Sequence, residues 1–122
     1  MVKIQSFKDL AIWQRSMCLI EEVYKITKNF PKEELYGLTS QLRRAVVSIP
    51  SNIAEGFARF HNNEYKQFLY ISLGSCAEVS TQITIASRLG YIANNKVDIL
   101  LDEIEQISKM TMGLVKKLNS KN

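Results

Sequence analysis

Histidine, cysteine and long apolar runs are scarce in this chain, and each scarcity argues against a class of protein. The two cysteines, Cys18 and Cys76, are isolated and lack the CxxC spacing of a zinc site, so we expect reduced, packed thiols. No apolar run approaches the roughly 20 residues that cross a bilayer, and the first residues, MVKIQSFKDL, lack the apolar core of a signal peptide. The sequence therefore predicts a cytoplasmic protein without membrane contact, metal or cofactor.

Composition and charge are ordinary for a globular protein. The chain has 122 residues, of which 46% are hydrophobic and 23% charged, with no low-complexity or linker-like stretch, so residues 1–122 are predicted to form one domain. Sixteen Lys and Arg against twelve Asp and Glu give a net charge of +4. This balance suits an anionic partner, but many proteins without one share it.

Apolar residues recur at spacings of three and four along four stretches, which predicts four helices and no strands. The expected helices cover about 7–28, about 31–57, about 63–89, and a last stretch that begins at Asn94 or Asn95. Short connections join them, so the predicted fold is an all-α, antiparallel up-down four-helix bundle. On the first helix, two neighbouring apolar stripes cover roughly half of the circumference, more than the apolar face of a typical surface helix. We therefore expect this helix to pack against a second partner.

Pro50 lies inside the second predicted helix, whose apolar stripe continues through it without a change of phase. A proline cannot donate to the carbonyl four residues earlier and its ring crowds that carbonyl, so a kink is expected there. We expect Gly74 to lie opposite and to let the bent helix approach closely.

A polar layer is expected between the second and third helices. If the chain turns near residue 61, antiparallel partners have numbers that sum to about 122, which pairs Arg44 with Glu78 and Ser48 with Ser75. Such a buried ion pair would fix the register of the helices at little net gain in stability. The residues of this layer are Gln41, Arg44, Ser48, Asn52, Glu55, Ser75, Glu78 and Gln82.

Catalytic patterns are weak, so we predict that the protein is not an enzyme. The single histidine, His61, falls in a predicted loop, which leaves the helical serines without an evident base and excludes a Glu-x-x-His di-iron site. Gly56 alone is not a phosphate-binding loop.

The stretch QLRRAVVSIPSNIAEG, residues 41–56, resembles the signature of the small four-helix-bundle family encoded by intervening sequences in bacterial 23S ribosomal RNA genes. The segments FKDLAIWQ, FPKEELYGL, GSCAE and LGYI resemble its other recurring blocks, so the resemblance spans roughly residues 7–92. It implies a cytosolic bundle that assembles into a homopentamer and has no established enzyme activity. The accessory protein of diversity-generating retroelements, a pentamer that contacts a reverse transcriptase and nucleic acid, is related to this family.

Two functional classes remain open at this point. The first is a non-enzymatic RNA binder that contacts phosphates, and the second is an oligomeric scaffold or adaptor for a protein such as a reverse transcriptase. The phosphate-contacting candidates are Arg43, Arg59, Lys66, Lys116, Lys117 and Lys121. Simple solubility is the alternative explanation of these exposed charges.

Overall fold

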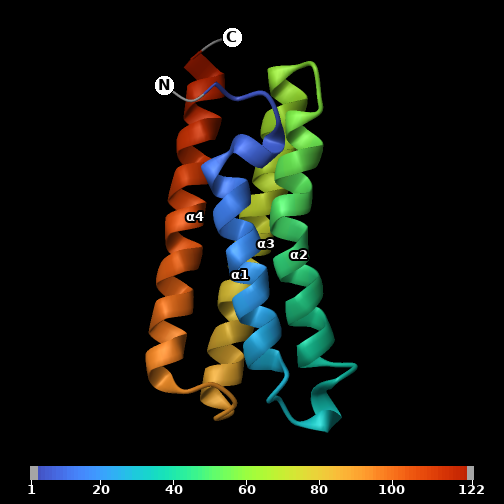
Figure 1. The fold of residues 1–122 in the computed structure, drawn as a ribbon, viewed down its shortest axis with the longest axis vertical. Coiled ribbons are helices and arrows are strands. Elements are labelled where there is room, and N and C mark those ends of the chain that lie inside the picture. The colour runs from blue at the N-terminus through green and yellow to red at the C-terminus, as the bar shows by residue number, and fades with distance from the viewer. Residues whose placement is uncertain (1–2, 121–122) are drawn as a thin grey trace.

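Four long helices form the molecule in a computed structural model that describes residues 3–120. They are α1 (Ala11–Thr27), α2 (Leu38–Phe57), α3 (Asn62–Arg88) and α4 (Asn94–Ser120). Successive helices run in opposite directions, and α1 lies between α4 and α2 in front of α3 (Figure 1). The expected all-α, up-down four-helix bundle is confirmed. No strand occurs in residues 3–120, and none of the helices described there is long and apolar enough to span a membrane.

The first two helices begin later in the chain than the apolar pattern indicates. Phe7–Asp9 form a separate 3₁₀ turn, capped by Ser6, and Leu10 has an extended conformation (φ −75°, ψ 128°) that separates this turn from α1. Before α2, Lys32–Glu34 form a second 3₁₀ turn, and Gly37 takes non-helical angles (φ −116°, ψ −112°). The predicted start of the second helix near Pro31 is therefore wrong.

Glu34 explains why α2 begins where it does. One of its carboxylate oxygens accepts a hydrogen bond from the Leu38 N–H at 3.2 Å, and the other accepts one from the Tyr91 hydroxyl at 3.0 Å. The carboxylate therefore satisfies a free donor at the helix N-terminus, where negative charge is favoured. The hydrogen bond from the Tyr91 hydroxyl to Glu34 raises the pKa of Tyr91.

The helix α2 continues through Pro50 without interruption, and the kink expected there is not confirmed. Side chains donate additional hydrogen bonds to three successive carbonyls that precede the proline. Ser51 Oγ donates to Val47 O at 2.8 Å, Asn52 Nδ2 to Ser48 O at 2.8 Å, and Ser72 Oγ of α3 to Ile49 O at 3.0 Å. These side-chain bonds add to the helical hydrogen bonds next to Pro50, whereas the carbonyl that the proline leaves without its helical donor is that of Val46.

On α3, the buried face is displaced by one residue from the stripe of Phe68, Ile71 and Ile85 that apolar spacing indicates. Ile71 and Ile85 are exposed, whereas Ser72 and Ala86, each one position further along, are buried. The buried residues of α3 are Leu69, Ser72, Ser75, Cys76, Val79, Ile83 and Ala86. Burial raises the pKa of the Cys76 thiol, and a hydrogen bond with Ser108 lowers it in part. Cys18, in contrast, is exposed, so the expectation of two packed thiols is wrong for it.

The bundle accommodates most of the apolar surface of α1. Leu19 and Val23 are buried, while Trp13 and Ile20 are partly buried and pack against the same core. Among the residues of the two predicted stripes, Met17 and Tyr24 are more exposed than the others. The surface left over on α1 is therefore smaller than the sequence pattern indicates.

Pairs of hydrogen-bonded residues confirm the predicted register of α2 against α3. Ser72 bonds to Ile49, and Ser75 Oγ donates to Ser48 Oγ at 2.8 Å. The glycine that permits close packing is Gly56, because a Cβ atom there would lie 2.9 Å from Phe68 Cβ. Gly74 has open space at its Cβ position, so its expected role opposite Pro50 is wrong.

Replacing these two glycines should have opposite effects on stability. Gly56→Ala should lower the free energy of unfolding by about 1–3 kcal/mol, because the new methyl group overpacks the contact with α3. Gly74→Ala, at an exposed helical position, should raise it by about 0.5–1 kcal/mol through helix propensity. Urea denaturation of both variants measures the difference, and equal effects would contradict the assignment of Gly56.

Candidate nucleic-acid interface

One end of the bundle gathers three segments that are far apart in the sequence. The segment before α1, the turn between α2 and α3, and the C-terminal part of α4 all lie at the same end (Figure 1). The other end carries the α1–α2 and α3–α4 connections. A hydrogen bond of 2.7 Å from Lys66 Nζ to Asn119 Oδ1 joins the start of α3 to the end of α4.

Cations outnumber carboxylates at this end, which we call the basic end. In residues 3–10, 55–67 and 115–120, six Lys and Arg face three Asp and Glu, and these segments carry most of the net charge of the chain. The six cations of the basic end are Lys3, Lys8, Arg59, Lys66, Lys116 and Lys117. Lys66 is partly buried and the other five are exposed.

Four of the six sequence candidates for phosphate contact therefore lie at one end. They are Arg59, Lys66, Lys116 and Lys117. Lys121 lies outside the described residues. Lys3 and Lys8 belong to the same surface and were not among the candidates. The predicted up-down topology could have identified Lys3 and Lys8 as candidates, because four antiparallel helices bring the C-terminus back to the end of the bundle where the chain starts.

Arg43 lies away from the basic end, between α1 and α2. Its Nε donates to Thr27 Oγ1 at 2.8 Å, and its guanidinium carbon lies 4.6 Å from the centre of the Tyr24 ring. These contacts hold the side chain between α1 and α2. The structure thus separates Arg43 from the other phosphate-contacting candidates.

The turn at the basic end is held in place by packing and by backbone hydrogen bonds. The Arg59 guanidinium stacks over Phe68, 4.7 Å from the ring centre, and the Arg59 N–H donates to Gly56 O at 3.1 Å. The rings of Phe57 and Tyr65 meet edge to face, with centres 6.1 Å apart. Burial raises the pKa of Tyr65 to about 12, so its phenol stays neutral and is no base at neutral pH.

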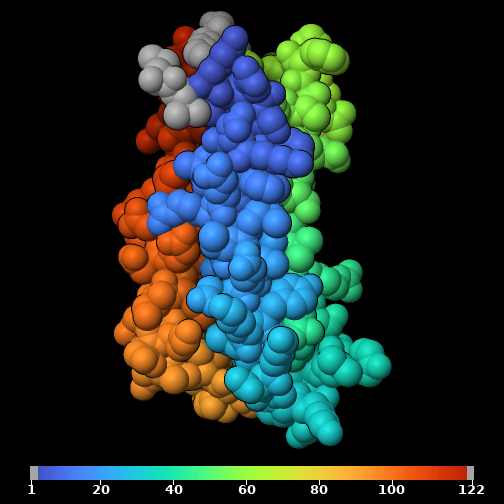
Figure 2. Space-filling model, in the orientation of Figure 1, coloured from blue at the N-terminus to red at the C-terminus, as the bar shows by residue number. Residues whose placement is uncertain are grey.

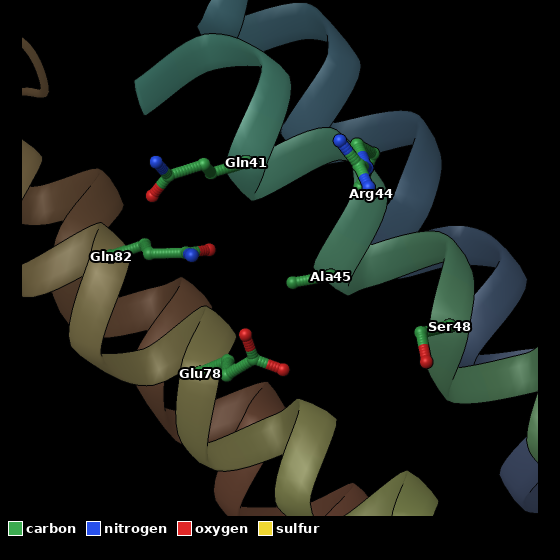
Figure 3. A pocket seen from close by; sticks show the side chains of 6 residues that line it. All are labelled: Gln41, Arg44, Ala45, Ser48, Glu78 and Gln82. Atoms are coloured by element: carbon green, nitrogen blue, oxygen red, sulfur yellow. The ribbon is translucent and has the colours of Figure 1, made fainter. Parts of the chain in front are cut away.

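A second polar site lies on the side of the bundle, in a groove of about 420 Å³ between α2 and α3. Gln41, Glu78 and Gln82 project into the space between the two helices (Figure 3). Buried Gln82 Oε1 has no hydrogen-bond partner. The residues that line this groove are Gln41, Arg44, Ala45, Ser48, Glu78 and Gln82.

The predicted polar layer is brought together in space, but it is largely a surface feature. Gln41, Arg44, Glu55 and Glu78 are exposed. Arg44 and Glu78 line the same groove without forming an ion pair, since none of the described ion pairs within 4.0 Å joins them. The expectation of a buried Arg44–Glu78 pair is wrong, because both side chains are exposed in an open groove and do not pair.

The buried part of this layer consists of small side chains. Asn52 Nδ2 donates to Ser48 Oγ at 2.9 Å, and Ser75 Oγ donates to the same oxygen at 2.8 Å. Ser75 is buried, and Ser48 and Asn52 are partly buried. This hydrogen-bonded cluster satisfies its own polar atoms and offers no evident nucleophile and base.

The described residues contain little else that could support catalysis. His61 is exposed in the turn at the basic end, away from the groove. Within residues 3–120, no three His, Cys, Asp or Glu side chains are grouped so that they could hold a metal ion. What the geometry offers is a cation-rich surface.

Comparison with known proteins identifies the family. The model of the family described as "23S rRNA-intervening sequence protein" matches residues 8–113. The chain belongs to this family. No curated protein matches it. As a member of the intervening-sequence family it shares its fold with a crystal structure from Bacteroides thetaiotaomicron VPI-5482, described as a protein of unknown function from the S23 ribosomal protein family.

The similarity to the Bacteroides protein covers 87% of this chain and 99% of that one, with a TM-score of 0.80 and 18% sequence identity. This likeness concerns the fold. Neither comparison indicates a catalytic activity.

The exposure of Arg44 and Glu78 leads to a stability test. Glu78→Ala and the double variant Arg44→Met with Glu78→Leu should each change the free energy of unfolding by less than about 0.5 kcal/mol, as exposed substitutions do. Ser72→Ala is the positive control and should cost about 1 kcal/mol, because its buried hydroxyl bonds to α2. A loss of about 3–5 kcal/mol for Glu78→Ala, recovered in the double variant, would show a buried ion pair.

Proposed function

We propose that this protein is a non-enzymatic, cytosolic homo-oligomer that binds RNA through its basic end. The observation that carries this proposal is the convergence of six cations from three separate segments on one end of the bundle. Phosphate contacts supply most of the affinity of sequence-independent nucleic-acid binding, and they need clustered Lys and Arg. The description of the family names 23S rRNA, so ribosomal RNA is the first ligand to test.

The distribution of charge along the bundle favours the basic end over other surfaces. At the opposite end, residues 22–37 and 87–99 contain five cations and four carboxylates, so the charges nearly balance. Carboxylates outnumber cations in the middle of the bundle. An anionic polymer is therefore attracted most strongly to one end.

Exposed apolar residues on the side of the bundle support the oligomeric part of the proposal. Tyr70, Ile71 and Ile85 of α3, and Leu89 directly after it, are each 43–54% exposed. Ile85 and Leu89 lie one helical turn apart, and Ile71 lies on the same face about 21 Å from Ile85, with Glu78 between them. Exposed large apolar side chains at these positions are candidates for a protein–protein contact. We propose a pentamer, in accordance with the sequence resemblance.

A protein-binding adaptor is the second candidate function, and the groove between α2 and α3 favours it. Glu78 and Arg44 lack ion-pair partners there, and Gln82 Oε1 lacks a donor. A partner protein such as a reverse transcriptase could supply complementary groups. Binding of this kind would depend much less on salt than contact with RNA phosphates.

The RNA proposal predicts a steep dependence of affinity on salt. Binding of a structured 23S rRNA fragment, followed by fluorescence anisotropy, should weaken strongly between about 50 and 200 mM salt. Replacing Lys66, Lys116 and Lys117 with Gln should weaken binding and make the logarithmic salt slope shallower by about two to three units.

The matched control removes the same charge from the opposite end, by changing Lys25, Lys28 and Lys96 to Gln. This variant should keep the affinity and the slope of the unmodified protein. Equal losses in both triple variants would show that net charge, and not the basic end, governs binding. An absence of RNA binding at low salt would refute the proposal.

The oligomeric proposal is tested by light scattering. Five copies of the 14.0 kDa chain form a particle of about 70 kDa. Replacing Ile71 and Leu89 with Lys should dissociate it, because both side chains are exposed in the single chain and would be covered in the assembly. A monomer at micromolar concentration for the unmodified protein would overturn the pentamer.

A further inference from the structure

Phe60 is the most exposed large apolar residue of the described chain. It lies in the turn between α2 and α3, and 98% of its surface is open to solvent. The other aromatic residues around this turn are engaged, since Phe57 packs on Tyr65, and Phe68 carries the Arg59 guanidinium. Apolar side chains stabilise a fold by being buried, and a fully exposed phenyl ring contributes nothing in this way. Any role of the Phe60 ring therefore involves a binding partner.

The turn that carries Phe60 is short and well anchored. It comprises residues 58–61, and it is closed by hydrogen bonds from the Ala58 N–H to Ala54 O at 3.1 Å and from the Tyr65 N–H to His61 O at 3.1 Å. The close contact at Gly56 lies directly beneath it. Because the backbone is already ordered, the ring can engage a ligand without a large loss of conformational entropy.

The charge around the ring indicates the class of ligand. Phe60 follows Arg59 directly, and it belongs to the end of the bundle where six cations gather. In Figure 2 the α2–α3 turn, in green, stands at the edge of that end, clear of the N-terminal segment. An exposed aromatic ring beside cations is the arrangement with which proteins bind unpaired bases, the ring stacking on the base and the cations contacting phosphates.

Tyr36 provides an internal comparison at the opposite end of the bundle. It is 93% exposed, in the α1–α2 connection, but it follows Glu33 and Glu34 closely. Carboxylates repel phosphates, so this second exposed ring is poorly placed for an RNA chain. The two rings therefore have similar exposure, but Phe60 lies at the end of the bundle where cations outnumber carboxylates.

We propose that Phe60 stacks on an unpaired base of single-stranded RNA while Arg59 and Lys66 contact the flanking phosphates. The inference rests on the proposed RNA binding and adds to it the class of RNA. A base inside a duplex is covered on both faces by its neighbours, so the ring selects loops and single strands. Stacking is tolerant of sequence, because every base offers a π face.

The test compares Phe60→Leu with Tyr36→Leu in the full-length protein. With a single-stranded RNA of about ten nucleotides, Phe60→Leu should weaken binding about five- to hundredfold, the usual effect of losing one stacked base. Its affinity for an RNA duplex, and its salt slope, should stay unchanged. Phe60→Trp should retain the affinity, and Tyr36→Leu should match the unmodified protein on both probes.

A 2-aminopurine base in the single strand supplies a second readout, because stacking quenches its fluorescence. The unmodified protein and Phe60→Trp should quench it, and Phe60→Leu should not. Unchanged single-strand affinity in Phe60→Leu, with steep salt dependence retained, would overturn the stacking role and leave the basic end as an RNA site. Equal weakening on single strand and duplex would also overturn it. An unmodified protein that binds neither RNA would refute the proposed function itself.

Discussion

The contact between α2 and α3 at Gly56 leaves no room for a side chain, and the rest of the structure depends on this constraint. A Cβ atom there would lie 2.9 Å from Phe68 Cβ and 3.0 Å from Tyr65 Cδ1. With the two helices this close, the four residues 58–61 suffice to connect them. The register set at this point continues along both helices to the Ser72–Ile49 and Ser75–Ser48 hydrogen bonds. A larger residue at 56 would displace all of these contacts together.

Apolar spacing was sufficient to predict the number of helices, but it failed to predict the buried face of α3. There the stripe with Ile71 and Ile85 is interrupted by Glu78 and Gln82 on the same face. The bundle buries the neighbouring face, which contains Leu69, Val79 and Ile83 and small residues whose hydroxyls bond to α2. The observed buried face of α3 differs from the predicted one by one residue, which corresponds to about 100° of rotation about the helix axis. The same rotation carries Glu78 to the surface.

The candidate site was predictable in its residue types and only in part in its location. The cations were visible in the sequence, but Lys8 and Lys117 are more than one hundred positions apart and meet only through the up-down topology. Arg43 shows the opposite error, because it was grouped with these cations but lies between α1 and α2, where it contacts Thr27 and Tyr24. Phe60 left a weak signal, an aromatic residue in a short polar turn. Its exposure became evident only when the packing of Phe57 and Phe68 was known.

Exposed apolar residues lie on the side of the bundle and cations lie at one end, and this separation would allow the proposed assembly and the proposed RNA binding to coexist. The apolar residues Ile71, Ile85 and Leu89 lie along the side of α3, whereas the cations lie at one end. Subunits that associate through their sides leave their ends free. In a cyclic ring every subunit has the same orientation to the axis, so the basic ends would share one face. In the proposed ring, several weak sites on one face would bind one RNA chain with an effective concentration that no single subunit provides. A subunit of modest charge can thus contribute to a strongly binding surface.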